Sequence, residues 1–155
     1  MWNVSRDSYK EMIKVSEAAF HNLAFFEKSS SAVCSFKDGS VGVYSLQKRG
    51  WESLASPGHR ETIFDAKFCP SNANHLATAS FDGTVKVWDV RSMECVSSSP
   101  GNEGVLYCLS WSPTEPVLLA SSAEGHVLVY DVERGVVVTR IQHHTDAVFR
   151  VAWCP

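Results

Sequence analysis

The sequence contains a histidine, a serine and an aspartate that are the residue types of a hydrolytic triad. His59 precedes Ser80 by 21 residues, and Asp82 follows Ser80 by two. In a hydrolase these side chains act as general base, nucleophile and orienting carboxylate. A nucleophilic serine, however, is normally presented on a strained turn such as Gly-x-Ser-x-Gly, beside N–H groups that stabilise an oxyanion. Ser80 lies instead in the alternating segment LATASF, which favours a structural role.

Metal and phosphate sites are not indicated either. His143 and His144 are the closest pair of histidines, but adjacent residues of a strand point to opposite faces and cannot readily share one ion. The segment PGNEG (100–104) contains glycines but lacks the Lys-Ser/Thr of a phosphate-binding loop. We therefore expect no catalytic residue, no metal ion and no cofactor.

The region around Ser80 recurs along the chain at a fixed period. SFDGTVKVWDV (80–90) matches SAEGHVLVYDV (122–132) 42 residues later and FKDGSVGVYSL (36–46) 44 residues earlier. A second column, in which FCP (68–70) is followed by WSP (111–113) and WCP (153–155), has spacings of 43 and 42 residues. Two columns with one period indicate a repeat protein.

Each repeat reads as four short strands. In the clearest repeat, the runs 63–68, 76–81, 84–90 and 94–99 are rich in β-branched and aromatic residues and are separated by turn signals. Asp82-Gly83, between the second and third runs, is a strong hairpin signal. A four-stranded antiparallel sheet of this size has to cover both faces with neighbouring sheets, and radial stacking of such sheets gives a β-propeller. We therefore predict an all-β protein made of propeller blades.

The period divides the chain into an incomplete propeller of about three and a half blades. The predicted units are the end of a preceding blade (1–16), three blades (17–56, 57–100 and 101–142) and the first strand of a further blade (143–155). Because propellers usually close with 4–8 blades, we expect the missing blades or self-association to complete the ring.

One segment fits this division less well than the rest. Residues 9–26 have apolar residues at helical spacing. The repeat register predicts instead an outer strand near 11–15 and an inner strand near 20–26.

Composition excludes several classes of protein. Apolar residues make up 45% of the chain and charged residues 20%, and the net charge of −3 is scattered, which gives no basic patch for nucleic acid or a membrane surface. No run approaches the roughly 18 apolar residues that cross a bilayer. The N-terminus is polar within five residues, unlike a signal peptide. Five cysteines without a CxxC pair favour reduced thiols in an intracellular, cytoplasmic protein.

The middle repeat resembles the WD-repeat family of β-propellers. The matching positions are Gly58-His59, Ile63, Phe68, Pro70, Ser80, Asp82, Gly83 and Trp88-Asp89. HHTDAVFRVAWCP (143–155) resembles the start of a further repeat. The resemblance implies a structural hydrogen-bond network that runs from the Asp82 carboxylate to the His59 ring, on to the Ser80 hydroxyl and then to the Trp88 indole N–H. Such buried polar groups are costly unless each has a partner.

The sister repeats depart from this pattern. The repeat at 101–142 has Asn102 at the histidine position, and its other network positions hold Ser122, Glu124 and Tyr130. The repeat at 17–56 keeps Asp38 and Tyr44 but has Phe36 at the serine position. We therefore expect neither repeat to form the complete network, and we expect both to depend more on packing.

The resemblance implies a non-catalytic scaffold for protein–protein interaction. In the family, the turns between the second and third strands and the connections between blades commonly contact other proteins. The resemblance therefore implies six exposed candidates for partner binding: Lys37, Arg60, Glu61, Phe81, Glu103 and Ala123. No nucleic acid or membrane partner is expected.

Two alternatives remain open at this stage. One is an enzyme that uses the central channel, where the first strands offer Asp65, Lys67, Tyr107, Ser110 and Arg150. The other is peptide binding at an open sheet edge.

Overall fold

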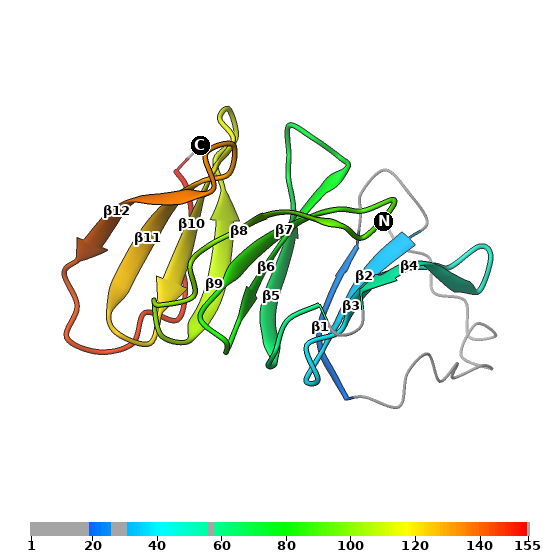
Figure 1. Cartoon of the computed structure of the whole chain (residues 1–155), viewed down its shortest axis with the longest axis horizontal. Coiled ribbons are helices and arrows are strands. Elements are labelled where there is room, and N and C mark those ends of the chain that lie inside the picture. Colours follow the sequence, from blue (N-terminus) through cyan, green and yellow to red (C-terminus); the bar gives the residue numbers. More distant parts are fainter. Residues whose placement is uncertain (1–18, 26–30, 56–57, 155) are drawn as a thin grey trace.

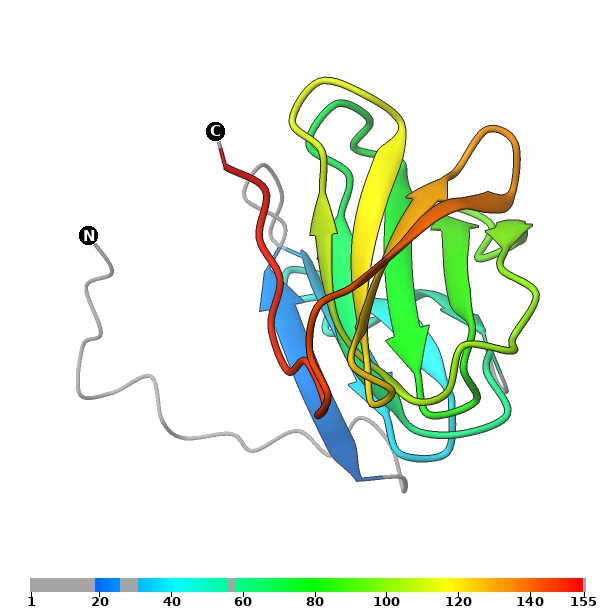
Figure 2. The same cartoon turned by 90° about the vertical axis from the view of Figure 1, so that its left-hand side faces the viewer.

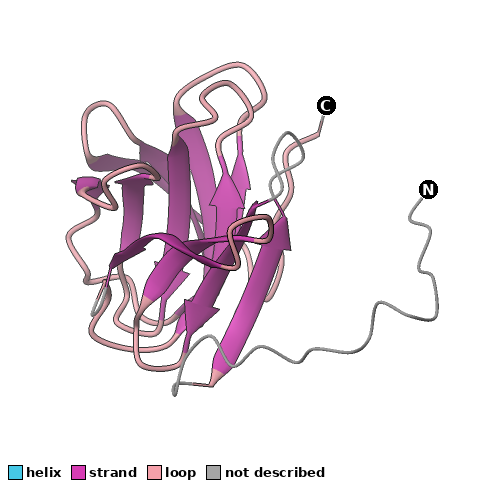
Figure 3. Cartoon of the chain, turned by 90° about the vertical axis from the view of Figure 1, so that its right-hand side faces the viewer, coloured by secondary structure: helices cyan, strands magenta, loops and turns pink. Residues whose placement is uncertain are grey.

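The computed structural model describes residues 19–25, 31–55 and 58–154, and every regular element in these ranges is a β-strand (Figure 3). The strands form three four-stranded antiparallel sheets in which consecutive strands pair, and the sheets follow one another across the molecule in chain order (Figure 1). Sheet A contains β1 (Phe20–Phe25), β2 (Ser31–Phe36), β3 (Val41–Ser45) and β4 (Gly50–Ala55). Sheet B contains β5 (Ile63–Phe68), β6 (His75–Ser80), β7 (Val85–Asp89) and β8 (Cys95–Ser98). Sheet C contains β9 (Leu106–Trp111), β10 (Val117–Ser122), β11 (His126–Asp131) and β12 (Val136–Gln142).

The predicted all-β class and four-stranded blades are confirmed. The strands of sheet B differ from the predicted runs by at most one residue at any end. β1 confirms the inner strand expected near 20–26 and excludes a helix at 20–25. The outer strand expected near 11–15 lies outside the described residues.

The second-to-third-strand turns are short because an acidic residue and a glycine close them. In sheet B, the Asp82 carboxylate accepts the backbone N–H of Thr84 at 2.9 Å, and Gly83 adopts a φ of 79°. Residues other than glycine disfavour a positive φ, because their Cβ atom clashes with the backbone there. In sheet A, a Cβ on Gly39 would overlap the backbone carbonyl of His59, so this turn also packs directly against the start of the next repeat.

The core lies between the sheets. Buried apolar residues of β6 and β7 pack against those of sheet C, among them Ala77, Val87, Leu109, Leu118 and Leu128. A second cluster joins sheets A and B through residues such as Val33, Val41, Ile63, Leu76 and Trp88. Each fully buried large apolar side chain contributes roughly 1.5–3 kcal/mol relative to an exposed one. The outer strands β8 and β12 are mostly exposed, so stacking of the inner three strands provides most of the burial.

The C-terminal segment 143–154 contains no strand, although a strand was predicted there (Figure 2). Its side chains nevertheless dock on sheet C, because Trp153 Nε1 donates to the Ser110 carbonyl at 2.9 Å. Trp111 makes the corresponding bond one repeat earlier, to the Lys67 carbonyl at 3.0 Å. In both cases the indole N–H of one repeat donates a hydrogen bond to the first strand of the preceding repeat.

The described residues include no helix that is long and apolar enough to cross a membrane.

Candidate functional site

Four side chains of sheet B form a continuous chain of hydrogen bonds, here called the polar relay: Asp82, His59, Thr78 and Trp88. His59 comes from the connection before β5, Thr78 from β6, Asp82 from the β6–β7 turn and Trp88 from β7. His59 Nδ1 lies 3.0 Å from Asp82 Oδ2, and His59 Nε2 lies 2.7 Å from Thr78 Oγ1. Trp88 Nε1 donates to the same Thr78 oxygen at 2.8 Å. The relay therefore connects a loop, a turn and two strands.

The expected link from His59 to Ser80 is wrong, because Thr78 occupies that place. Ser80 Oγ lies instead 3.2 and 3.0 Å from the carbonyl oxygens of Glu61 and Thr62 and accepts the Asp82 N–H at 3.1 Å. Residues two apart in a strand share a face, so both hydroxyls point the same way. Ser80 ends the strand, whereas Thr78 lies deeper, where the Trp88 ring reaches it. The alternation of LATASF places Thr78 and Ser80 on one face of the strand and does not distinguish between them.

These bonds can all form with a neutral His59 ring. The Thr78 hydroxyl accepts the Trp88 N–H and can then donate its own hydrogen to His59 Nε2, which leaves Nδ1–H to donate to Asp82. Burial lowers the pKa of His59 below its usual value, and the bond and charge of Asp82 oppose this only in part. Burial raises the pKa of Asp82, but hydrogen bonds from His59, Thr84 and the Arg60 N–H outweigh it and hold this pKa well below its usual range.

Protein groups lie within hydrogen-bond distance of both nitrogens of the His59 ring. The His59 side chain is fully buried, as is Ser80, and each polar atom described above already has a protein partner. His59 Nε2 faces the Thr78 hydroxyl, and His59 Nδ1 faces both the Asp82 carboxylate and the Thr84 hydroxyl at 3.0 Å. The relay can fix the turn to the strands.

The exposed candidates divide into two groups. Lys37, Arg60 and Glu61 are exposed, and the Phe81 side chain is 52% exposed at the β6–β7 turn, whereas Ala123 is only half-buried. Glu103 was predicted to be exposed, and that prediction is wrong: it is 4% exposed and forms an ion pair with Arg140 of β12. Arg140 Nε donates to Glu103 Oε2 at 2.9 Å, and a second nitrogen donates to Oε1. A buried carboxylate needs such partners, which explains its inward orientation.

Sheets A and C replace the relay with other contacts. Cys34 in sheet A and Ala120 in sheet C occupy the position of Thr78 in strand register. The Tyr130 hydroxyl, which corresponds to the Trp88 indole, bonds instead to Ser97 Oγ of the preceding sheet at 2.7 Å. The Tyr44 hydroxyl is buried without a hydrogen-bond partner among the residues the structure describes.

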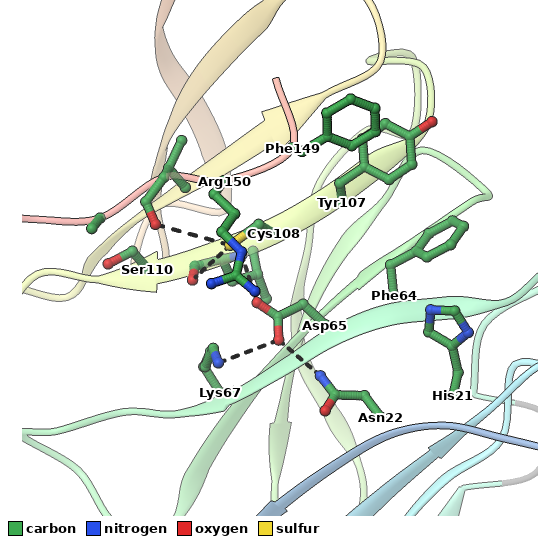
Figure 4. Close-up of a pocket in the computed structure, with 13 residues that line it drawn as sticks. His21, Asn22, Phe64, Asp65, Lys67, Tyr107, Cys108, Ser110, Phe149 and Arg150 are labelled. Carbon is green, nitrogen blue, oxygen red and sulfur yellow. Dashed lines mark hydrogen bonds and ion pairs between the residues drawn. The ribbon is translucent and has the colours of Figure 1, made fainter. Parts of the chain in front are cut away.

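The first strands and the C-terminal segment line a groove of about 820 Å³ (Figure 4). All five residues predicted to line a central channel, namely Asp65, Lys67, Tyr107, Ser110 and Arg150, lie along it. Asp65 connects three repeats: it accepts Asn22 Nδ2 of β1 and the Leu109 N–H of β9, both at 2.9 Å. Sequence reasoning missed this role, although the 43-residue spacing of Asn22 and Asp65 placed them in one column.

A row of aromatic rings along this groove was also missed. Phe64, Tyr107 and Phe149 follow His21 at spacings of 43, 43 and 42 residues. The shared period was the available signal, but the residue types differ. Among the described residues, no three His, Cys, Asp or Glu side chains are grouped in a way that could hold a metal ion.

Comparison with known proteins agrees with this architecture. The family described as "Anaphase-promoting complex subunit 4 WD40 domain" matches residues 66–155, so the chain belongs to the WD40-repeat proteins.

Among individual proteins, it is similar to Coronin-7 of Mus musculus, with 35% identity over 101 residues that cover 61% of this chain and 11% of that protein. It is also similar to Polyadenylation factor subunit 2 of Schizosaccharomyces pombe, with 34% identity over 89 residues, 56% of this chain and 18% of that protein. The chain thus spans less than a fifth of these relatives. The crystal structure of the computationally designed Ika4 protein has the same fold, with a TM-score of 0.77 at 22% identity, and the match covers 91% of this chain and 82% of that one.

Proposed function

We propose that this chain is a non-catalytic scaffold for protein–protein interaction and that it forms part of a WD40 propeller. The observation that carries the proposal is the polar relay, in which His59 and Asp82, two of the three residues considered for a hydrolytic triad, hold a turn on the sheet. Turns held in this way present exposed side chains in fixed positions, and binding residues concentrate on loops of rigid scaffolds.

The exposed residues of the β6–β7 turn and of the connection before β5 are the proposed partner surface: Arg60, Glu61 and Phe81. Lys37, on the equivalent turn of sheet A, extends this surface, since the Thr62 hydroxyl donates to its carbonyl at 3.0 Å. Phe81 is the proposed anchor, because exposed aromatic side chains are frequent hot spots of interfaces.

The names of one relative and of the matching family support a role within assemblies. One is called a subunit of a polyadenylation factor, and the matching family is described by a subunit of the anaphase-promoting complex. These names concern those proteins, and we propose only the general role for this chain.

The channel-enzyme alternative gains no support from the groove. Its carboxylate, Asp65, already accepts hydrogen bonds from Asn22 and from the backbone of Ala66 and Leu109. A general base needs a free lone pair directed at the substrate.

We also propose that further blades or a second copy complete the ring. Val138 and Ile141 of β12 are 46% and 41% exposed, which leaves apolar surface on sheet C for a neighbour. An intracellular location is consistent with five cysteines that are all free.

Affinity capture of the tagged chain from cells, read by quantitative mass spectrometry, tests the scaffold proposal. We expect specific protein partners above a tag-only control, and we expect Phe81→Ala to lose part of them. Val96→Ala is the matched control, because Val96 is also 52% exposed but lies on β8, away from the turn. Capture of no specific protein would contradict the scaffold proposal, and equal capture by both variants would contradict the role of Phe81.

A further inference from the structure

Four consecutive repeats each place one aromatic ring along the groove, and these rings form a contiguous row, here called the aromatic ladder: His21, Phe64, Tyr107 and Phe149 (Figure 4). The His21 and Phe64 ring centroids are 4.8 Å apart, those of Phe64 and Tyr107 are 5.3 Å apart, and those of Tyr107 and Phe149 are 5.1 Å apart. Each spacing lies in the range of favourable aromatic pairs. The ladder therefore crosses from sheet A to the C-terminal segment without interruption.

The ladder is accessible although its rings support one another. Phe149 is 67% exposed, and Phe64 and Tyr107 are half-buried. The ring centroid of Phe81, which belongs to the proposed partner surface, lies 6.3 Å from that of Phe64. Phe81 therefore connects the ladder to that surface. Rings that are already held by neighbours lose little conformational entropy when a ligand packs on them. Exposed apolar surface of this continuity is characteristic of interaction sites.

The accessible charge beside the ladder is positive. Lys67 and Arg150 line the same groove as the rings (Figure 4), Arg150 is exposed, and the Lys67 side chain is 49% exposed. Asp65, which lies between them, has a side chain that is only 9% exposed, and its oxygens accept hydrogen bonds from three groups of the protein. Its Oδ1 also lies 3.5 Å from Lys67 Nζ, so these two side chains form an ion pair. A ligand in the groove therefore meets aromatic surface next to the exposed Arg150 and next to Lys67, which is half-exposed and paired with the buried Asp65.

We propose that this groove binds an extended, acidic segment of a partner protein whose apolar or aromatic side chains pack on the ladder while its carboxylates pair with Lys67 and Arg150. An extended peptide suits the site, because alternate side chains point to opposite sides and can separate the apolar set from the acidic set. Carboxylate–guanidinium pairs are among the strongest charge-assisted hydrogen bonds. This inference rests on the proposed scaffold function and names the chemistry of one partner.

Single-stranded nucleic acid is the other ligand class that combines rings with cations. The ladder is less suited to it, because neighbouring rings contact one another at edge-on or tilted angles and leave no parallel gap for a base. The chain also carries a net charge of −3, unlike a nucleic-acid-binding surface. An acidic peptide is therefore the ligand that the site favours.

Fluorescence anisotropy with three labelled probes tests the inference on the whole 155-residue chain. The probes are a short peptide that alternates phenylalanine with aspartate or glutamate, the same peptide with lysine in place of each acid, and an oligothymidylate of similar length. We expect saturable binding of the acidic peptide alone, which weakens at high salt because surface charge is screened. Phe149→Ala and Arg150→Ala should each weaken it by about tenfold.

Controls keep the result specific to the groove. Val96→Ala and Arg91→Ala remove an exposed apolar and an exposed basic side chain outside it and should leave the affinity unchanged. The double charge reversal Lys67→Glu with Arg150→Glu should make the chain bind the lysine peptide in place of the acidic one. Such binding would show that the groove of the variant is still folded. Circular dichroism melting curves that match the unsubstituted chain establish that each variant is folded.

Three results would overturn the inference: no saturable binding of the acidic peptide, binding that Phe149→Ala and Arg150→Ala leave unchanged, or preference for the oligothymidylate. The capture experiment separates this failure from that of the scaffold proposal. Partners lost by Phe81→Ala but kept by Phe149→Ala, without peptide binding, would remove the ladder site and leave the scaffold in place. Absence of any specific captured partner would instead remove the scaffold proposal itself.

Discussion

The indole N–H of Trp88 on β7 donates to the Thr78 hydroxyl on β6 at 2.8 Å, which fixes the two strands to each other by their side chains as well as by their backbones. The residues are diagonal neighbours, since Trp88 pairs with Leu76 and Thr78 pairs with Lys86. Because the Thr78 hydroxyl can accept from Trp88 and donate to His59, one small side chain closes a connection from strand to loop. Polar residues that resemble a hydrolytic triad thus act in the architecture of the blade.

Removal of the acid at the start of the relay should destabilise the fold. Asp82→Ala leaves the His59 ring, the Thr84 hydroxyl and the Arg60 N–H without their acceptor. We expect a loss of roughly 1–3 kcal/mol in the free energy of unfolding, measured by urea denaturation. Asp131→Ala is the control, because Asp131 accepts only local groups of its own turn in the described contacts and should cost less. An unchanged midpoint for Asp82→Ala would count against the relay.

Stability should decrease as the solution becomes mildly acidic. Because burial lowers the pKa of His59, the unfolded chain binds this proton at a higher pH than the folded chain. The contribution of His59 is therefore complete above its usual pKa of 6.5 and is lost as the pH falls from there toward the lower folded value. The pKa of Asp82 is also depressed, so its contribution is lost only below its usual value of 3.8.

Urea midpoints between about pH 8 and about pH 5 provide the measurement. The urea midpoint should stay constant above pH 6.5 and decrease below it, and His59→Gln should reduce that decrease. A decline of the same slope in the variant would show that other groups are responsible.

Two tyrosines at equivalent positions should respond in opposite ways to loss of their hydroxyl groups. The Tyr130 hydroxyl bonds to Ser97, so Tyr130→Phe should cost about 1 kcal/mol in the free energy of unfolding. The Tyr44 hydroxyl is buried without a described partner, so Tyr44→Phe should be neutral or stabilising. Both free energies come from the same denaturation assay, and each variant controls for the other. Equal losses in the two variants would contradict the assigned partners.

The five thiols should differ in reactivity. Burial raises the pKa of Cys34 to about 11, and Cys69 is also buried, whereas Cys95 and Cys154 are exposed. The thiolate is the reactive form, so we expect two rapid equivalents with a thiol reagent at about pH 8. Peptide mapping should assign these two equivalents to Cys95 and Cys154, and the remaining thiols should react after denaturation. Rapid labelling of Cys34 in the native chain would contradict its buried position.

The strands of this chain could be predicted from its sequence, whereas the hydrogen-bond and ion-pair partners of several side chains could not. Strand runs and the Asp82-Gly83 turn follow from local patterns, so the sheets and their order could be predicted. Thr78 was missed because it shares a strand face with Ser80, and only depth in the sheet distinguishes the two hydroxyls. Glu103 was expected to be exposed because its partner, Arg140, lies 37 residues away on another strand. Such long-range pairs depend on the packed structure and leave no mark on a local motif.

The aromatic ladder illustrates the same limit at the scale of the repeat. Its residues share a column with the period of the chain, but they are a histidine, two phenylalanines and a tyrosine. A comparison of the repeats by residue identity therefore does not detect this column. Once β1, β5 and β9 are placed side by side, their rings fall into contact, and the chemistry of the groove becomes visible (Figure 4).

A double-mutant cycle of Thr78→Val with Trp88→Phe tests most directly whether the polar relay holds the blade together. The free energies of unfolding of the four chains come from urea denaturation, and Thr78→Ser, which keeps the hydroxyl, serves as the control. Residues in one hydrogen-bond network are coupled, and we expect an interaction energy of about 1 kcal/mol or more. A coupling that is indistinguishable from zero, with a Thr78→Val loss no larger than that of Thr78→Ser, would contradict the account.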